Sequence, residues 1–384
     1  MRNAAAVAIL CGMAGAVALA GAQTNAGKTL DIYFIDTEGG QSTLFVSPTG
    51  ESMLVDSGNA GGRDLDRILA TLGAAGVKQI DHMWSTHYHG DHIGALEELA
   101  KRVPIKRFYD HGPVAANDRA TPAPFMAMYE ALSKERRTIV KPGDKVPMAG
   151  LDIVTVTSNA VALKNNLPGG GKPNPACAGV AKKDESAYTD PDNGASAGFV
   201  MTFGKFRTID LGDMTWNGEL DIVCPTNRIG KIDLFVVSHH GIDRSNSPAL
   251  VHGLQPRVAI MNNGTRKGGA LGTFQVLETS PGLEDRWQLH WSYNVGVEHN
   301  AAGVFIANID DNETIASVLT APPPAPRGAP GAPPAARGAG PGRAGPGAAA
   351  HTPAHWIKVS AERDGTFTVT NPRNGFSKTY RPVN

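Results

Sequence analysis

Short apolar runs separated by glycine-containing turns dominate the first part of the chain. Apolar positions at residues 30–35, 42–46 and 53–55 predict three strands joined by tight turns. Between residues 65 and 72 the apolar side chains recur three and four positions apart, which predicts a helix. The run from Ile80 to Trp84, which is apolar at Ile80, Met83 and Trp84, then predicts a strand.

The same two patterns continue through the rest of the chain, and strand-like runs outnumber helical ones. Further strands are predicted at residues 106–109, 151–157, 197–203, 206–211, 232–237, 258–261 and 304–309. Further helices are predicted at residues 125–136, 216–223 and 274–279.

Two stretches lack any such periodicity. Residues 158–196 are rich in Pro, Gly, Asn, Lys and Asp, and a loop of that length is usually functional or disordered. Residues 321–353 are nearly all Pro, Gly, Ala and Arg, which predicts a flexible or extended linker. Residues 354–384 contain a predicted hairpin that is too small to be stable alone, so we expect it to dock on the main domain, residues 23–320.

The first 22 residues have the parts of a secretory signal peptide: a charged start, an alanine-rich apolar run and small residues before the expected cleavage. We therefore expect a mature chain that begins at Gln23 and is secreted or periplasmic. The apolar run is short and rich in Ala and Gly, which argues against the alternative of a membrane anchor. In an oxidising compartment Cys177 and Cys224 can form a disulfide, and the sequence leaves this open because it does not show their distance.

Length and charge limit the classes of partner. The chain has 384 residues, enough for one large domain with an appendage, and its 36 Lys and Arg balance 36 Asp and Glu. Composition therefore gives no electrostatic reason to expect a standing partnership with nucleic acid or an anionic membrane. The expected partner is a small-molecule or ester substrate.

The chemistry concentrates in residues 86–92, Thr-His-Tyr-His-Gly-Asp-His, between a predicted strand and an amphipathic run. Three imidazoles and a carboxylate suit zinc first, with manganese or iron as alternatives. His87 and His89, two apart in extended backbone, share a face and can bind one ion, while Asp91 and His92 reach a second. We expect two zinc ions per chain; the alternative is a surface loop that happens to be rich in histidine.

Two later strand ends offer the remaining ligands. Asp213 follows a predicted strand and a glycine, and is the best candidate for a carboxylate that bridges both ions; the alternative is a turn aspartate. His239 and His240 follow another strand, and we favour His239 as the ligand because it leaves the strand first. His240 is then expected to support the site or contact the substrate.

These motifs together resemble the metallo-β-lactamase superfamily, and within it the secreted or periplasmic proteins similar to the hydrolase domain of the competence protein ComEC. Residues 34–42 and 54–58 are similar to the two opening strand-turn motifs of that subgroup. The resemblance implies an α/β (α+β) fold: an αββα sandwich of two mixed sheets with outer helices and a metal site at one edge. It also implies that Asp56 is a buried residue that orients the site.

One ligand of the family pattern is missing. Most catalytic members supply a third histidine to the first ion from the region before the bridging aspartate, and the subgroup commonly lacks it. Here that region contains only His111, which follows the main motif too closely. Asn193 or Ser196 could take the position weakly, or water could.

The predicted function is a metal-dependent hydrolase in which Asp91 and Asp213 act in catalysis, with a phosphodiester or related ester as the favoured substrate. Arg266 and Lys267, in a glycine-rich loop, could contact a phosphate, although a solvated basic turn is the plainer interpretation. A β-lactam or lactone hydrolase is the first alternative, because one metal core serves many substrates. A metal-binding but inactive protein is the second.

The remaining histidines have no partner pattern or lie among aromatic residues. His82, His252, His299, His351 and His355 are interpreted as structural or surface residues. Trp287, His290 and Trp291 alternate in a way that favours strand packing, with a substrate cleft as the alternative.

Overall fold

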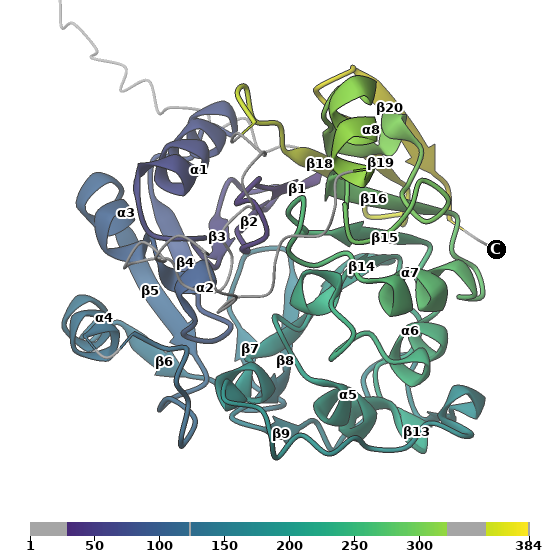
Figure 1. The fold of residues 1–384 in the computed structure, drawn as a ribbon. Coiled ribbons are helices and arrows are strands. Elements are labelled where there is room, and N and C mark those ends of the chain that lie inside the picture. The colour runs from purple at the N-terminus through teal and green to yellow at the C-terminus, as the bar shows by residue number, and fades with distance from the viewer. Residues whose placement is uncertain (1–28, 123, 321–350, 383–384) are drawn as a thin grey trace, which may run out of the picture.

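A computed structural model describes residues 29–122, 124–320 and 351–382, and these residues form two large mixed β-sheets (Figure 1). The predicted leader, residues 1–22, and most of the predicted linker lie outside the described residues. Within the described part of the chain, no helix has the length and apolar character needed to cross a membrane.

The first sheet has the strand order β20-β19-β18-β1-β2-β3-β4-β5-β6. Its strands are β1 (Leu30–Phe34), β2 (Thr43–Val46), β3 (Ser52–Val55), β4 (Ile80–Trp84), β5 (Ile105–Asp110), β6 (Arg137–Ile139), β18 (Ile357–Ala361), β19 (Phe367–Asn371) and β20 (Phe376–Tyr380). The strands from β3 to β6 pair in parallel and the others antiparallel.

The second sheet has the order β17-β16-β15-β14-β12-β11-β8-β7, with β9 paired to β8. Its strands are β7 (Lys145–Val146), β8 (Asp152–Ser158), β9 (Val161–Ala162), β11 (Gly198–Phe203), β12 (Phe206–Asp210), β14 (Leu234–Val236), β15 (Val258–Met261), β16 (Asp285–His290) and β17 (Ile306–Asn308). The strands from β12 to β17 are parallel, which requires a helical crossover between successive strands or a long loop. Strands β10 (Lys172–Pro173) and β13 (Thr226–Asn227) form a separate short ribbon.

The helices cover the outer faces of the two sheets (Figure 1). They are α1 (Gly62–Ala74), α2 (Gly90–Ile93), α3 (Leu96–Arg102), α4 (Phe125–Ser133), α5 (Trp216–Val223), α6 (Pro248–Leu254), α7 (Leu271–Glu278) and α8 (Asn312–Thr320). Short 3-10 turns are η1 (Pro175–Cys177), η2 (Pro191–Ala195), η3 (Ser238–Gly241) and η4 (Gly303–Phe305).

Alternation along the strands creates three apolar layers. In β1, Ile32 and Phe34 lie in the core between the sheets, whereas Tyr33 packs in the outer layer with Ile68 of α1. In the second sheet, Phe235 of β14 likewise packs outward, in the layer that contains α5, α6 and α7. Two sheets packed on each other with helices outside confirm the predicted αββα sandwich.

The C-terminal segment extends the first sheet. A two-stranded hairpin was expected, and the structure adds a third strand, β20, whose residues alternate between half-buried and exposed. Strand β18 pairs along the whole of β1. Tyr380 of β20 then reaches the other sheet, because its hydroxyl accepts a hydrogen bond from Trp287 Nε1 at 3.0 Å. Trp287 is fully buried there, which supports strand packing over a substrate cleft.

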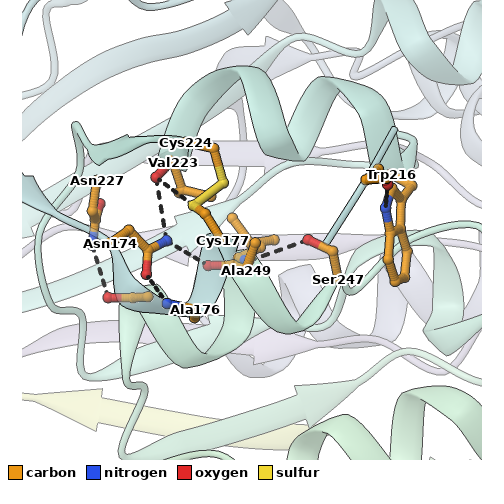
Figure 2. The surroundings of a disulfide bond; sticks show 12 residues. Asn174, Ala176, Cys177, Trp216, Val223, Cys224, Asn227, Ser247 and Ala249 are labelled. Carbon is orange, nitrogen blue, oxygen red and sulfur yellow. Dashed lines mark hydrogen bonds between the residues drawn. A yellow bond between two sulfur atoms is a disulfide. The ribbon is translucent and has the colours of Figure 1, made fainter. Parts of the chain in front are cut away.

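The long aperiodic segment is held in place by a disulfide between Cys177 and Cys224 (Figure 2). The bond joins η1 to the residue that ends α5. Asn174 adds two hydrogen bonds beside it, to Val223 O at 3.2 Å and to Ala249 O at 2.9 Å. The loop is therefore fixed to α5 and α6, the two helices that follow the strand ends carrying Asp213 and the histidine pair.

Candidate metal centre

All of the predicted site residues come from loops at the carboxyl ends of four strands, two in each sheet. Asp56 follows β3, and residues 87–92 follow β4. Asp213 follows β12, and the histidine pair follows β14. Because both sheets contribute strand ends at the same edge, side chains more than a hundred positions apart meet there.

Four of these side chains form a compact group: Asp91, His92, Asp213 and His240. His92 Nε2 lies 3.2 Å from both Asp213 Oδ2 and His240 Nε2. Asp91 Oδ2 lies 3.5 Å from His92 Nε2 and 3.2 Å from His240 Nε2. His240 Nε2 lies 3.4 Å from Asp213 Oδ2.

These spacings are those of a tetrahedral zinc site. Ligand atoms at about 2.0–2.1 Å from one zinc ion must lie roughly 3.3–3.4 Å from each other. Two buried atoms beside the group, Asp213 Oδ1 and His87 Nε2, have no hydrogen-bond partner among the described residues. A buried polar atom without a partner is costly, so both are well suited to a metal ion. The residues present therefore fit the zinc ion that the sequence implied.

The protonation states of Asp213, Asp91 and His87 also suit metal binding. Burial alone would raise the pKa of Asp213, but His239, His92 and His240 hold it well below its ordinary value. Burial would likewise raise the pKa of Asp91, which Lys267 and His92 hold well below the ordinary range. Burial lowers the pKa of His87, and the nearby imidazoles lower it further. Ionised carboxylates and a neutral imidazole are the forms that bind a metal.

The histidine pair departs from the sequence interpretation, in which His239 was the ligand and His240 its support. His240 lies in the compact group, and His239 Nε2 contacts Asp213 Oδ2 at 3.3 Å. The physical reason is the backbone: both residues are left-handed, each with φ of 53°, so the chain turns sharply instead of alternating. Both imidazoles therefore reach the same carboxylate oxygen.

His239 is consequently available for the first ion, where this chain lacks the third histidine of the family pattern. His87 Nε2 lies 3.9 Å from the same oxygen of Asp213, a wider spacing than in the compact group. His89 packs beside His87, with 4.4 Å between the ring centroids. Asn193 and Ser196, the substitutes expected from sequence, each have a buried oxygen without a hydrogen-bond partner in the described part of the chain.

Asp56 lies where the resemblance implied. Its Oδ2 is 2.7 Å from His92 Nδ1, and it accepts hydrogen bonds from the backbone N–H and the hydroxyl of Thr86. The carboxylate thereby fixes the ring of His92 and leaves Nε2 directed at the centre. Asp56 itself adopts a left-handed conformation with φ of 58°.

Two supporting aspartates were missed from the sequence. Asp118, in the loop after β5, places Oδ2 3.0 Å from His89 Nε2, which leaves Nδ1 of that ring for a metal. Asp192, in η2, accepts a hydrogen bond from Tyr88 N at 2.9 Å and lies 3.3 Å from His111 Nε2. Neither residue lies in a segment with strand or helix periodicity. The sequence therefore showed each of them only as an aspartate in a loop, which gives no sign of a role at the site. His111 supports the motif from this side.

Lys267 also belongs to the centre. Its ammonium group forms an ion pair with Asp91, and its side chain remains partly exposed at 26%. Arg266 instead lies over the ring of Tyr293, 5.3 Å from its centroid. Of the two basic residues singled out from the sequence, Lys267 is the one that meets the ligand set.

Comparison with known proteins agrees with this geometry. A family model described as Metallo-beta-lactamase superfamily matches residues 36–146. These residues include Asp56 and the 87–92 stretch, and they lie in an αββα sandwich. Residues 36–146 thus match the metallo-β-lactamase superfamily, in agreement with the fold and with the arrangement of the candidate ligands.

Among curated proteins, the chain is similar to ComE operon protein 3 of Bacillus subtilis (strain 168), at 26% identity over 197 residues. The match covers 51% of this chain and 22% of that protein, so this chain spans a small part of its relative's length. A solved structure of a putative metal-dependent hydrolase from Parabacteroides distasonis is 16% identical and matches with a TM-score of 0.41 over 67% of this chain and 92% of that chain. CmlA, a diiron beta-hydroxylase from Streptomyces venezuelae, is 16% identical, with a TM-score of 0.37 over 62% and 45% of the two chains.

Proposed function

We propose that this protein is a metal-dependent hydrolase that binds zinc, two ions per chain, and cleaves a phosphodiester or a related ester. The observation that carries the proposal is the compact group of Asp91, His92, Asp213 and His240, whose ligand atoms are 3.2–3.5 Å apart. His87, His89 and His239 are the proposed ligands of the other ion, with Asp213 between the two.

The side chains of the site have different roles in the proposed reaction. When bound, a divalent metal supplies Lewis acidity, which acidifies water and polarises the bond under attack. Asp91, partly exposed on the ligand set, accepts a hydrogen bond from the attacking water and orients it. Asp213 holds the imidazoles together from the buried side. Asp56 and Asp118 keep His92 and His89 in the ligating tautomer.

Lys267 favours an anionic substrate. Its ammonium group lies beside Asp91, where a phosphate oxygen of a bound diester would meet positive charge. A β-lactam or a lactone also presents a carbonyl oxygen that Lys267 and the metal could polarise, so these substrates remain the alternative. Replacement of Lys267 by Ala is therefore expected to weaken diester hydrolysis more than lactone hydrolysis.

Turnover and metal content of one variant test the function. His240→Ala should lose turnover of every substrate and part of the bound zinc, because it opens the compact group. His299→Ala, which removes a partly exposed imidazole paired with Glu278, is the control. Full turnover by His240→Ala would refute the hydrolase mechanism. Zinc-loaded protein without turnover of any substrate would favour the inactive, metal-binding alternative.

Substrate class is tested by parallel assays of bis-p-nitrophenyl phosphate, a simple lactone and nitrocefin. We expect the phosphodiester to be cleaved fastest. Faster cleavage of the lactone or of nitrocefin would replace the phosphodiester preference by the alternative while leaving the metal mechanism in place.

We also propose that the protein works in a secreted or periplasmic setting. The disulfide between Cys177 and Cys224 supports this, because such bonds persist in oxidising compartments and are rare in the cytosol. Detection of the protein in the periplasmic or culture fraction, against a cytosolic marker, checks the location.

A further inference from the structure

A second cluster of histidine and carboxylate side chains is built around Glu38, in the turn between β1 and β2. One ligand atom from each of Glu38, His290 and His351 lies within 4.8 Å of the other two. The three residues come from distant parts of the chain: the first turn, the end of β16 and the segment that precedes β18. None of them belongs to the metal centre described above.

His290 has one nitrogen occupied and one free. The residue is fully buried, and its Nε2 lies 2.6 Å from Asp36 Oδ1. Its Nδ1 is buried and has no hydrogen-bond partner among the described residues. Metal-binding histidines almost always use one ring nitrogen on the metal and donate from the other to a carboxylate, a backbone carbonyl or water. The arrangement at His290 is therefore that of a ligand with its supporting carboxylate.

Both ring nitrogens of His351 are buried and have no hydrogen-bond partner among the described residues, although each lies near a carboxylate. Its Nε2 lies 3.1 Å from Asp310 Oδ1, and its Nδ1 lies 4.0 Å from Glu38 Oε1. The ring centroids of His351 and His290 are 4.9 Å apart. The backbone of His351 is also fixed, because its N–H donates to Glu38 Oε1 at 3.3 Å and its carbonyl accepts from Arg67 at 2.8 Å.

The cluster carries more negative than positive charge when its imidazoles are neutral. Three carboxylates are present, Asp36, Glu38 and Asp310, and Arg67 pairs with the first two, at 3.0 Å and 3.1 Å. With neutral imidazoles, three negative charges face one positive charge in a largely buried place. One divalent cation would balance the difference. Two protonated imidazoles would balance it as well, so an experiment must separate a metal from protons.

We propose that Glu38, His290 and His351 form an auxiliary zinc site, with water as the fourth ligand. Two imidazoles and a carboxylate are a common zinc-binding set, and a cavity of about 390 Å³ borders the cluster at Asp36, Arg67 and His351. The site fixes the segment that enters β18 to the turn that leaves β1.

The same turn touches the main centre, so the auxiliary site positions part of it. Gln41 N donates to Asp91 O at 3.1 Å. Gly39 packs so closely on Lys267 that an added Cβ would lie 2.9 Å from the Cβ of that lysine. A metal ion on Glu38 therefore steadies the backbone behind Asp91 and the loop that carries Lys267, without contact with the substrate.

Zinc stoichiometry of the full-length protein tests the proposal. After zinc loading and removal of free metal, His351→Ala should hold one zinc equivalent per chain fewer than the unsubstituted protein. His355→Ala is the matched control, because it lies on the same segment and only its backbone bonds to Asn308. That control should keep the full zinc content.

Glu38→Gln is the second variant and guards against misfolding of the first, since it preserves side-chain length. It should also lose one equivalent while its far-UV circular dichroism is unchanged. Unchanged zinc content in folded His351→Ala and Glu38→Gln would overturn the auxiliary site and leave an ion-pair network of protonated imidazoles. Because the measurement counts metal and not turnover, the outcome is independent of the proposed hydrolase activity, which His240→Ala tests separately.

Discussion

Carboxylates behind the histidines shape the metal centre as much as the ligands do. Asp56 holds His92 and Asp118 holds His89, each at one ring nitrogen, so the opposite nitrogen faces the centre. Asp118 has further tasks, because it also accepts hydrogen bonds from the backbone N–H groups of Asp192 and Thr121. A single side chain thus connects three loop segments at the rim.

Replacement of Asp118 by Asn should weaken zinc binding by about 10- to 100-fold, the usual effect of losing a carboxylate behind a metal-bound histidine. The reason is that an amide does not fix the tautomer of His89 as a carboxylate does. Competition with a chelator measures the affinity. Asp221→Asn, at an exposed carboxylate that pairs with Lys182, is the control. Equal affinity in both variants would show that His89 needs no such support.

Glu219 provides a pH-dependent prediction away from the ligands. It is fully buried, and burial raises its pKa to about 7, although the N–H groups of Ser247 and Asn246 oppose the shift. The folded state therefore binds the proton more tightly than the unfolded state does. Between the ordinary value of 4.5 and about 7, stability should fall as pH rises.

The Glu219→Gln variant should lack this loss. Relative to the unsubstituted protein it should gain about 3 kcal/mol in unfolding free energy between pH 4.5 and pH 8, from 1.36 kcal/mol per pKa unit. Urea unfolding at several pH values measures the difference, and Glu97→Gln on the exposed face of α3 is the control. Parallel stability curves for Glu219→Gln and the unsubstituted protein would rule out a raised pKa.

At the scale of elements, the disulfide fixes an aperiodic segment that contains only short strands and 3-10 turns. It links residues 47 positions apart, from η1 to the end of α5 (Figure 2). That loop includes Asp192, which meets Tyr88 and His111 behind the main motif. Fixing this loop therefore affects the position of the main histidine motif as well as the stability of the fold.

Replacement of both Cys177 and Cys224 by Ser should cost about 4 kcal/mol of unfolding free energy, by the chain-entropy relation for a loop of this length. Chemical unfolding of the variant and of the oxidised protein gives the difference, and the reduced protein should match the variant. Equal stability of the oxidised and reduced protein would mean that the loop is held by its other contacts.

Strand β19 offers a matched pair of substitutions. Val369 is fully buried between the sheets, whereas its neighbour Thr368 faces outward. Val369→Asp should destabilise the fold by about 3–5 kcal/mol, because it buries an unpaired charge. Thr368→Asp should change stability by only about 0.5 kcal/mol. Thermal unfolding compares the two, and similar values would mean that the C-terminal strands are dispensable to the core.

For the whole molecule, the periodicity of apolar residues predicted the main strands and helices well. It did not predict which side chains contact one another across the fold. The strand at residues 80–84 and the helix at residues 216–223 have the predicted bounds. The predicted helix at residues 125–136 ends at Ser133, since Arg137 already begins β6. Strand β20 has an alternating pattern, but it is short and lies mostly at the surface.

The same difference between elements and contacts holds for the candidate metal centre. Adjacent ligands were visible in one stretch, and Asp213 was found by its place after a strand. The choice between His239 and His240 depended on two left-handed residues, which apolar spacing does not report. Asp118 and the partners of His351 required long-range contacts between loops, for which a single sequence carries no signal.

The pairing of β1 with β18 has a consequence for the time course of synthesis. Strand β1 emerges early, yet the partner for its free edge, β18, is made more than 300 residues later. Until then a nascent chain presents an apolar edge that can pair with any other strand. The edge of β1 is therefore covered only after residues 357–361 are translated, and a chain interrupted before them would carry an open template for aggregation.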